Sequence, residues 1–299
     1  MPTDNKLEPL SSQQKSRLKS IESYAVLYGS NQFPSSNGRG NKSVCDDQLP
    51  AATREDELKR SRDELRLYDL VIINEGTLPE AELQNLFQEK TQVVTYISLG
   101  EIEATDKSFD PSKKWIKKKN PDWNSYYVDA GAPEWQDLKL AEARERLSSP
   151  NYAGLFFDTV DTVDEYPDTS DGMLQLINRL RDEFPDAIFI QNRGFAVLEQ
   201  TAPLIDGLLF ENLSTLQNYS SFSDDDFQNY VVPLIKKVEK AQSDYNIVAL
   251  ALDYVCPDVA HRADAEKALK RAKTYSFMPF LSVRLLDWIP DYGIQRPYQ

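Results

Sequence analysis

Histidine and cysteine are the residues in which this sequence is poorest. The 299-residue chain contains one histidine, His261, and two cysteines, Cys45 and Cys256, with no Cys-x-x-Cys spacing. One histidine in a polar stretch argues against a histidine-based metal centre, and serine or cysteine triads lack their histidine partner. Two separated cysteines exclude a disulfide scaffold and a cysteine-built metal site, and the sequence leaves open whether they pair.

Long apolar runs and an excess of positive charge are also missing. No run approaches the ~20 residues that a membrane span requires, and the first twenty residues lack the apolar stretch of a secretory signal. Asp and Glu total 48 against 34 Lys and Arg, which gives a formal charge of -14. This balance disfavours nucleic acid as a partner, because it repels phosphates, and it favours a cationic ligand.

What the chain does contain is ample material for a core, since 40% of its residues are hydrophobic and 11% are aromatic. We find no internal repeat and no domain linker. We therefore expect a flexible N-terminal arm over residues 1–20, a single domain over residues 21–299, and a monomer.

Short apolar runs alternate along the chain with amphipathic, helix-like segments. The eight expected strands cover residues 24–29, 69–76, 93–101, 154–158, 187–194, 206–212, 247–254 and 277–284. The helix-like segments cover residues 54–67, 79–90, 133–147, 170–184, 224–242 and 262–275. Hydrophobic strands separated by helices predict a parallel sheet covered on both faces. Eight such units favour an α/β fold, a single (β/α)8 TIM-type barrel, with a doubly wound open sheet as the alternative.

Two connections are too long to hold only a helix. The loop after the first strand, residues 30–50, is rich in Ser, Asn, Gly and Pro, and the loop after the third strand includes a short extra strand at residues 126–129. Long loops at the C-terminal face of a barrel usually shape a substrate site.

Polar side chains collect where the apolar runs stop. They are Tyr28, Asn74, Glu75, Glu101, Asp158, Asn192, Arg193, Glu211, Asn212, Asp253, Tyr254, Ser282 and Arg284. Each alone is compatible with an ordinary turn or helix cap. Carboxylates at five of eight strand ends form a joint pattern, however, and in a barrel all these ends meet on one face.

The residue types that are absent from these strand ends exclude several classes of reaction. No lysine is there for a Schiff base, and no glycine-rich turn follows the last two strands to hold a phosphate or flavin. A carboxylate-bound Mg²⁺ held by Asp158, Glu211 and Asp253 remains open. The composition best fits paired-carboxylate catalysis on a glycoside, which needs one protonated and one ionised acid and no cofactor or metal.

Seven segments, taken in order, resemble glycoside hydrolase family 114 and a related hydrolase domain of the Pel biofilm system. They are "YAVLYG", "YDLVII", "VVTYISLGEIE", "YYVDAGAPEWQ", "GLFFDTVD", "IFIQNRGF" and "LLFENL". The resemblance implies a (β/α)8 barrel that performs endo-cleavage of α-1,4-linked galactosamine polymers, partly N-acetylated. It also implies an Asp ending the fourth strand and a Glu ending the sixth as essential acids, which match Asp158 and Glu211.

By similarity, Asp158 is expected to be the nucleophile and Glu211 the general acid and then base. Carboxyl groups about 5–5.5 Å apart would give retention, and a separation of roughly 6.5–9.5 Å would give inversion. The residues expected to bind a cationic aminosugar are Tyr28, Glu75, Glu101, Asn192, Arg193, Asp253 and Tyr254. Asp161 and Asp164 are expected at the rim of the cleft, and Glu165 and Asp168 in solvent.

Two other functions stay open. The barrel could bind a polysaccharide without cutting it, or it could be a Mg²⁺-dependent lyase or isomerase on the same fold. The resemblance implies an extracellular or periplasmic location, although the chain shows no export signal.

Overall fold

The computed structural model describes residues 18, 20–28 and 51–294 of the chain. Eight parallel strands form one sheet in the order β1-β2-β3-β7-β8-β9-β10-β11. Their bounds are β1 Tyr24–Leu27, β2 Leu70–Ile73, β3 Gln92–Ser98, β7 Gly154–Asp158, β8 Ile188–Asn192, β9 Gly207–Glu211, β10 Val248–Tyr254 and β11 Met278–Ser282. The expected loop at residues 30–50 and most of the expected arm lie outside the described residues.

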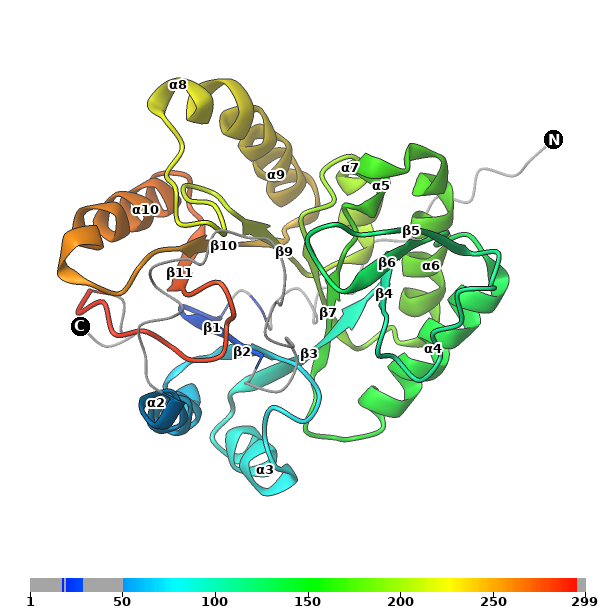
Figure 1. Cartoon of the computed structure of the whole chain (residues 1–299), viewed down its shortest axis with the longest axis horizontal. Helices are drawn as coiled ribbons and strands as arrows, with labels where there is room; N and C mark the ends of the chain where they lie inside the picture. Colours follow the sequence, from blue (N-terminus) through cyan, green and yellow to red (C-terminus); the bar gives the residue numbers. More distant parts are fainter. Residues whose placement is uncertain (1–17, 19, 29–50, 295–299) are drawn as a thin grey trace.

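The sheet curls until its first and last strands lie side by side (Figure 1). The ring of Tyr24 in β1 lies 5.6 Å from that of Phe280 in β11. Just past these strands, the Tyr28 backbone N–H donates to the Leu286 carbonyl at 2.7 Å. The Tyr24 hydroxyl also reaches the Ala251 carbonyl of β10 at 2.7 Å. The expected (β/α)8 barrel is thereby confirmed.

Helices surround the barrel as the amphipathic segments predicted. They are α2 Ala51–Glu64, α3 Glu80–Gln88, α4 Pro133–Leu147, α6 Ser170–Glu183, α9 Val232–Tyr245 and α10 Arg262–Thr274. Short turns of helix accompany them, namely η1 Leu65–Leu67, α5 Thr162–Glu165, η2 Pro167–Thr169, α7 Leu198–Thr201, η3 Ala202–Leu204, α8 Asp224–Asp226 and η5 Val259–His261. The segment expected as one helix over residues 224–242 is interrupted by a π-helical turn, η4 Phe227–Val231. Pro233 in the first turn of α9 lacks an N–H, which disfavours a regular α-helix through this point.

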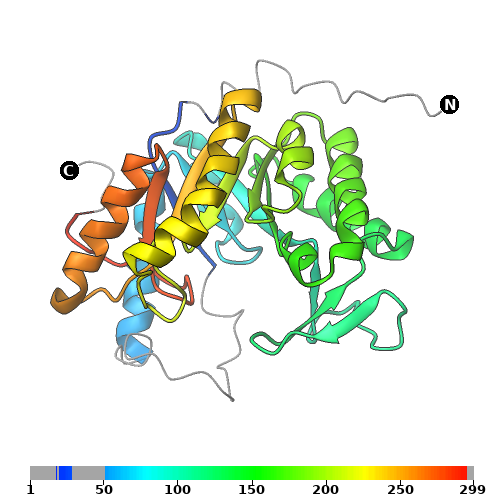
Figure 2. The same ribbon diagram turned by 90° about the horizontal axis from the view of Figure 1, so that it is seen from above.

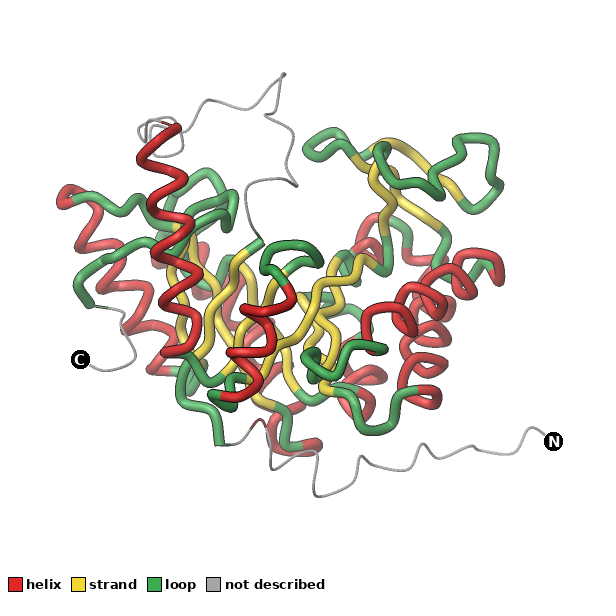
Figure 3. Tube along the Cα trace, turned by 90° about the horizontal axis from the view of Figure 1, so that it is seen from below, coloured by secondary structure: helices red, strands yellow, loops and turns green. Residues whose placement is uncertain are grey.

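A second, smaller sheet stands above the C-terminal ends of the barrel strands (Figure 3). Its antiparallel strands are β4 Glu101–Glu103, β5 Ile116–Lys119 and β6 Ser125–Val128, in the order β4-β6-β5. Only β6 was predicted. The expectation that the third barrel strand extends to Glu101 is corrected: β3 ends at Ser98, and Glu101 begins the small sheet.

Alternation along each strand sorts its side chains between two cores. Phe156 belongs to the cluster that includes Leu209 and Phe280 from other strands, which fill the barrel interior. Phe157 belongs instead to the cluster that includes Leu176 of α6, between sheet and helices. Because successive side chains of a strand point to opposite faces, Asp158 shares the interior face with Phe156.

A buried ion pair ties α6 to the N-terminal ends of two barrel strands. Arg181 of α6 donates to the Asp206 carboxylate at 2.9 Å, to the Leu204 carbonyl at 2.9 Å and to the Ala187 carbonyl at 2.8 Å. Asp206 also accepts the Phe189 backbone N–H of β8 at 2.9 Å. Burial of the guanidinium lowers the pKa of Arg181, although Asp206 raises it.

Replacing Arg181 should therefore destabilise the barrel strongly. We expect Arg181→Ala to lower the free energy of unfolding by about 3–5 kcal/mol, because it leaves a buried carboxylate unpaired. Urea unfolding followed by circular dichroism measures this change. Arg179→Ala is the matched control, since Arg179 lies on the same helix but forms an exposed pair with Asp137, which is worth about 1 kcal/mol or less. Equal losses in the two variants would contradict the prediction.

Candidate active site

Three neighbouring barrel strands each end in a polar side chain that faces the barrel interior. They are Asp158 on β7, Asn192 on β8 and Glu211 on β9. Two positions before each of them, the strand carries a residue of the interior cluster. These residues are Phe156, Ile190 and Leu209 respectively. Because the strands are parallel and adjacent, their C-terminal ends bring these three side chains together.

The Asn192 amide bridges the two acids. Its Nδ2 donates to Asp158 Oδ1 at 2.8 Å and to Glu211 Oε2 at 2.8 Å. Since both oxygens lie 2.8 Å from one nitrogen, they are separated by at most twice that distance, or 5.6 Å. Asn192 is 7% exposed, so this bridge is shielded from solvent.

Glu211 is held by two further donors. Its Oε1 accepts the Tyr254 hydroxyl at 2.7 Å and the Gln217 amide at 2.8 Å. Tyr254 is fully buried, and its pKa is raised well above the ordinary value by burial and then by the charge of Glu211. Gln217 was not predicted, because it lies in the polar loop after β9, where no pattern distinguishes it.

Burial is the main influence on Asp158. Burial, and after it the negative charge of Glu211, raise the pKa of Asp158 to about 6, while the hydrogen bonds from Asn192 and Tyr96 oppose the shift. Tyr96, from the middle of β3, was not predicted. Its ring packs edge-on against that of Tyr28 with 5.3 Å between centroids, so both tyrosines stand beside the acids.

Asp161 and Arg193 form an ion pair at the edge of this group. Arg193 Nε lies 3.0 Å from Asp161 Oδ2, and a second guanidinium nitrogen donates to the Glu211 carbonyl at 3.1 Å. Burial raises the pKa of Asp161 to about 6, although Arg193 opposes this shift. The other acids of the segment, Asp164, Glu165 and Asp168, are exposed.

Asp253 is placed outside the acid pair, in contrast to its expected contact with substrate. It is 2% exposed, and its Oδ1 accepts the backbone N–H groups of Ser214 and Thr215 at 2.6 and 2.9 Å. Burial raises its pKa to about 6. Because its neighbour Tyr254 faces the interior, alternation directs Asp253 to the other face, where it anchors the loop after β9.

The two remaining expected acids also bind protein groups. Glu101 accepts the Asn120 amide at 3.0 Å and the Ser125 hydroxyl within the small sheet, and burial raises its pKa, with a minor contribution from Asp158. Glu75 is exposed, and its carboxylate lies 3.8 Å from a guanidinium nitrogen of Arg146.

The loop of the small sheet reaches across to the last barrel strand. The Arg284 guanidinium lies 5.3 Å from the ring centroid of Trp123, which joins the loop between β5 and β6 to the segment after β11. Tyr127 of β6 packs against Tyr166, with 5.4 Å between centroids. Trp135 is buried in the core, where its indole N–H donates to the Leu99 carbonyl at 2.9 Å.

The acids do not converge as a cation site. Among the described residues, the one group of three or more metal-ligating side chains whose ligand atoms all lie within 4.8 Å of one another is Cys256, Asp258 and His261. Cys256 is disulfide-bonded, so it offers no thiolate. The Mg²⁺ alternative required Asp253 beside Asp158 and Glu211, and the loop contacts of Asp253 do not fit that arrangement.

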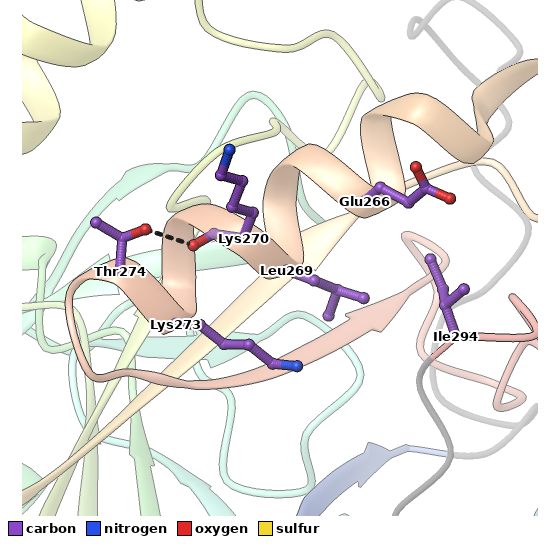
Figure 4. A pocket seen from close by; sticks show the side chains of 6 residues that line it. All are labelled: Glu266, Leu269, Lys270, Lys273, Thr274 and Ile294. Carbon is purple, nitrogen blue, oxygen red and sulfur yellow. Dashed lines mark hydrogen bonds between the residues drawn. The ribbon is translucent and has the colours of Figure 1, made fainter. Parts of the chain in front are cut away.

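A pocket beside α10 is lined by none of these site residues (Figure 4). It is lined by Glu266, Leu269, Lys270, Lys273, Thr274 and Ile294. One carboxylate among lysines offers no acid pair.

Within the described residues, no helix is both long and apolar enough to cross a membrane.

Solved structures resemble the chain over most of its length. The glycoside hydrolase domain of PelA from Pseudomonas aeruginosa aligns with a TM-score of 0.67 and 21% identity, over 90% of this chain and 97% of that one. Aspergillus fumigatus Ega3, in complex with galactosamine, aligns with a TM-score of 0.58 and 12% identity, over 89% and 92%. At these identities the likeness to solved structures shows the fold alone. A separate comparison with curated protein sequences found no match to this chain.

The family comparison covers most of the molecule. The model of glycoside hydrolase family GH114 matches residues 51–294, a range that includes the three interior-facing strand ends. The resemblance seen in the sequence motifs is thus confirmed. On this match the chain is a glycoside hydrolase and belongs to family GH114.

Proposed function

We propose that the protein is an endo-acting, retaining hydrolase of α-1,4-linked galactosamine polymers, with Asp158 as nucleophile and Glu211 as general acid and then base. The observation that carries the proposal is the Asn192 bridge, which keeps one oxygen of each acid within 5.6 Å of the other. This upper limit for the two oxygens is compatible with the ~5–5.5 Å of retaining enzymes and is below the ~6.5–9.5 Å that admits a water for inversion.

The substrate class is supported by chemistry near the acids and by the relatives. The Ega3 structure is a complex with galactosamine. A deacetylated galactosamine unit carries an ammonium group near neutral pH. Asp161 lies beside Glu211, with Asp164 and Glu101 near it, and Arg193 offsets part of their negative charge. Opposite charge at this rim attracts such a polymer, and a charge-assisted hydrogen bond would hold its amine.

The reaction then follows two steps. Asp158 attacks the anomeric carbon and forms a glycosyl ester, while Glu211 gives its proton to the departing glycosidic oxygen. In the second step Glu211 takes a proton from water, the hydroxyl adds to the anomeric carbon, and Asp158 leaves as carboxylate. Two inversions at one carbon give net retention, and both acids return to their initial protonation states.

The surroundings of the two acids suit these roles. With a pKa of about 6, Asp158 is mostly ionised at pH 7, as a nucleophile must be. Glu211 has the longer side chain, which is suited to reach the leaving oxygen, and Tyr254 and Gln217 orient it. Asn192 donates one N–H hydrogen bond to each acid and so fixes the distance between them.

Loss of either acid should abolish cleavage. We expect Asp158→Asn and Glu211→Gln each to lower the release of oligosaccharides from partly deacetylated galactosamine polymer by at least about 10³-fold. Release by the unaltered enzyme should persist in a chelator. Asp168→Asn is the matched control, since Asp168 is an exposed acid of the same segment, and it should retain wild-type activity. Binding without release by the unaltered enzyme would favour a non-catalytic barrel, and loss with chelator would favour a metal-dependent reaction.

The pH profile should distinguish the two possible assignments of roles. If Asp158 is the nucleophile, its carboxyl must be ionised, so kcat/KM should fall about tenfold per pH unit below its pKa of about 6. If Asp158 were instead the proton donor, kcat/KM would fall as the pH rises through about 6. Initial rates on the polymer between about pH 4 and pH 8 measure how kcat/KM changes with pH. Asp168→Asn should leave the pH of this change at the wild-type value.

The stereochemical outcome follows from the spacing of the acids. We expect the new reducing end to appear first as the α-anomer, because retention preserves the α-configuration of the cleaved bond. Proton NMR of the anomeric signals in the first minutes, before mutarotation, measures this. Initial appearance of the β-anomer would show inversion and would refute the nucleophilic role of Asp158.

A further inference from the structure

The three site residues share an uncommon backbone feature. Each is followed directly by a residue other than glycine with a left-handed backbone: Thr159 has φ +58°, Arg193 has φ +50° and Asn212 has φ +63°. Asparagine tolerates this region, whereas a β-branched residue such as threonine rarely adopts it. Such strain persists only where the surrounding structure imposes it.

The surroundings of Thr159 do impose it. Thr159 Oγ1 accepts the Gly100 backbone N–H at 2.8 Å, and it lies 2.8 Å from Ser98 Oγ and 2.7 Å from the Asp158 carbonyl. One hydroxyl carries one proton, so Thr159 donates to either Ser98 or Asp158 at a given moment. The side chain thus joins the end of β7 to the turn between β3 and β4.

The backbone on both sides of Thr159 is also hydrogen-bonded, on one side by the turn after β3 and on the other by Thr162 of α5. The Leu99 N–H donates to the Asp158 carbonyl at 3.0 Å, and the Thr162 N–H donates to the Thr159 carbonyl at 3.1 Å. A Cβ on Gly100 would lie 2.2 Å from the Thr159 carbonyl oxygen, so only glycine allows this approach. The chain therefore bends away directly after Asp158, and the bend has little freedom.

We propose that Thr159 is a positioning residue, whose clamped left-handed backbone sets the direction in which Asp158 points toward Asn192 and Glu211. This inference rests on the proposed function for its kinetic consequence. An acid that must lie at a fixed distance from a sugar carbon loses rate steeply when its support shifts by a fraction of an ångström. The strained backbone angle belongs to Thr159, but the side chain whose position it sets is that of Asp158.

Substitution of Thr159 by glycine distinguishes an effect on the position of Asp158, seen in kcat, from an effect on stability, seen in the melting temperature. Thr159→Gly removes the strain but also leaves the Gly100 N–H without its acceptor, so the two opposed effects should leave the melting temperature close to the wild-type value. It should nevertheless lower kcat by about 10–100-fold, with KM changed by less than about twofold. Thr159→Ser keeps the hydroxyl and should stay within about threefold of wild-type kcat.

A matched control comes from an exposed left-handed residue elsewhere. Ser276 has φ +58° and lies in the loop before β11, remote from the acids. Ser276→Gly relieves the same kind of backbone strain and should leave kcat at the wild-type value. Wild-type kcat in Thr159→Gly would overturn the inference, and so would unfolding of that variant, which would assign Thr159 a purely structural role.

The titration of Asp158, followed by NMR, tests the inference independently of turnover. Asp158 is faced by Glu211 from β9, Tyr96 from β3 and Asp161 from its own loop. A displaced carboxyl would lose part of the Asn192 hydrogen bond, so its pKa should rise in Thr159→Gly. An unchanged titration would overturn the positioning role. A wild-type enzyme that releases no fragments would refute the proposed function, and this titration would still decide the role of Thr159.

Discussion

The hydrogen bonds from one amide nitrogen of Asn192 to two carboxylates are the interaction on which this site depends. Two negative charges in a poorly solvated place repel each other, and a positive counter-ion between them would neutralise both. An amide donates a hydrogen bond to each acid and carries no net charge, so Asp158 and Glu211 are held close together without a cation between them. Tyr254 and Gln217 complete the shell around Glu211 without adding charge.

The barrel makes this bridge possible through register and alternation. β7, β8 and β9 are consecutive neighbours in the sheet (Figure 2). By alternation along each strand, the last residue of each lies on the interior face. The same alternation turns Asp253 away from the acids, to bind the backbone of Ser214 and Thr215. Burial raises the pKa of Asp158 and of Asp253 to about 6 alike, so contacts, and not pKa, distinguish the residue of the pair from the residue that holds a loop.

The small sheet links the chemistry to the long insertion after β3. Gly100 and Ser98, which precede it, bind Thr159 next to Asp158, while Trp123 at its far end meets Arg284 beyond β11. The insertion therefore serves both as a wall of the barrel mouth and as a support for the backbone at the end of β7. The half-buried carboxyl of Glu101 is hydrogen-bonded by Asn120 and Ser125 of the same insertion.

Most of the fold was predictable from the sequence, because eight apolar runs and six amphipathic segments depend on local periodicity alone. Asp158 and Glu211 were recognisable for the same reason, since each directly ends an all-apolar strand. Strand β5 was not, because its sequence "IKKK" has no apolar alternation, and Gln217 lies in a loop without a pattern. Strict alternation along β10 could have separated Asp253 from Tyr254 in advance. The chain by itself thus determined which acids stand at the strand ends, while closure of the barrel decided which share a donor, because contacts between side chains 19 and 34 residues apart depend on tertiary packing.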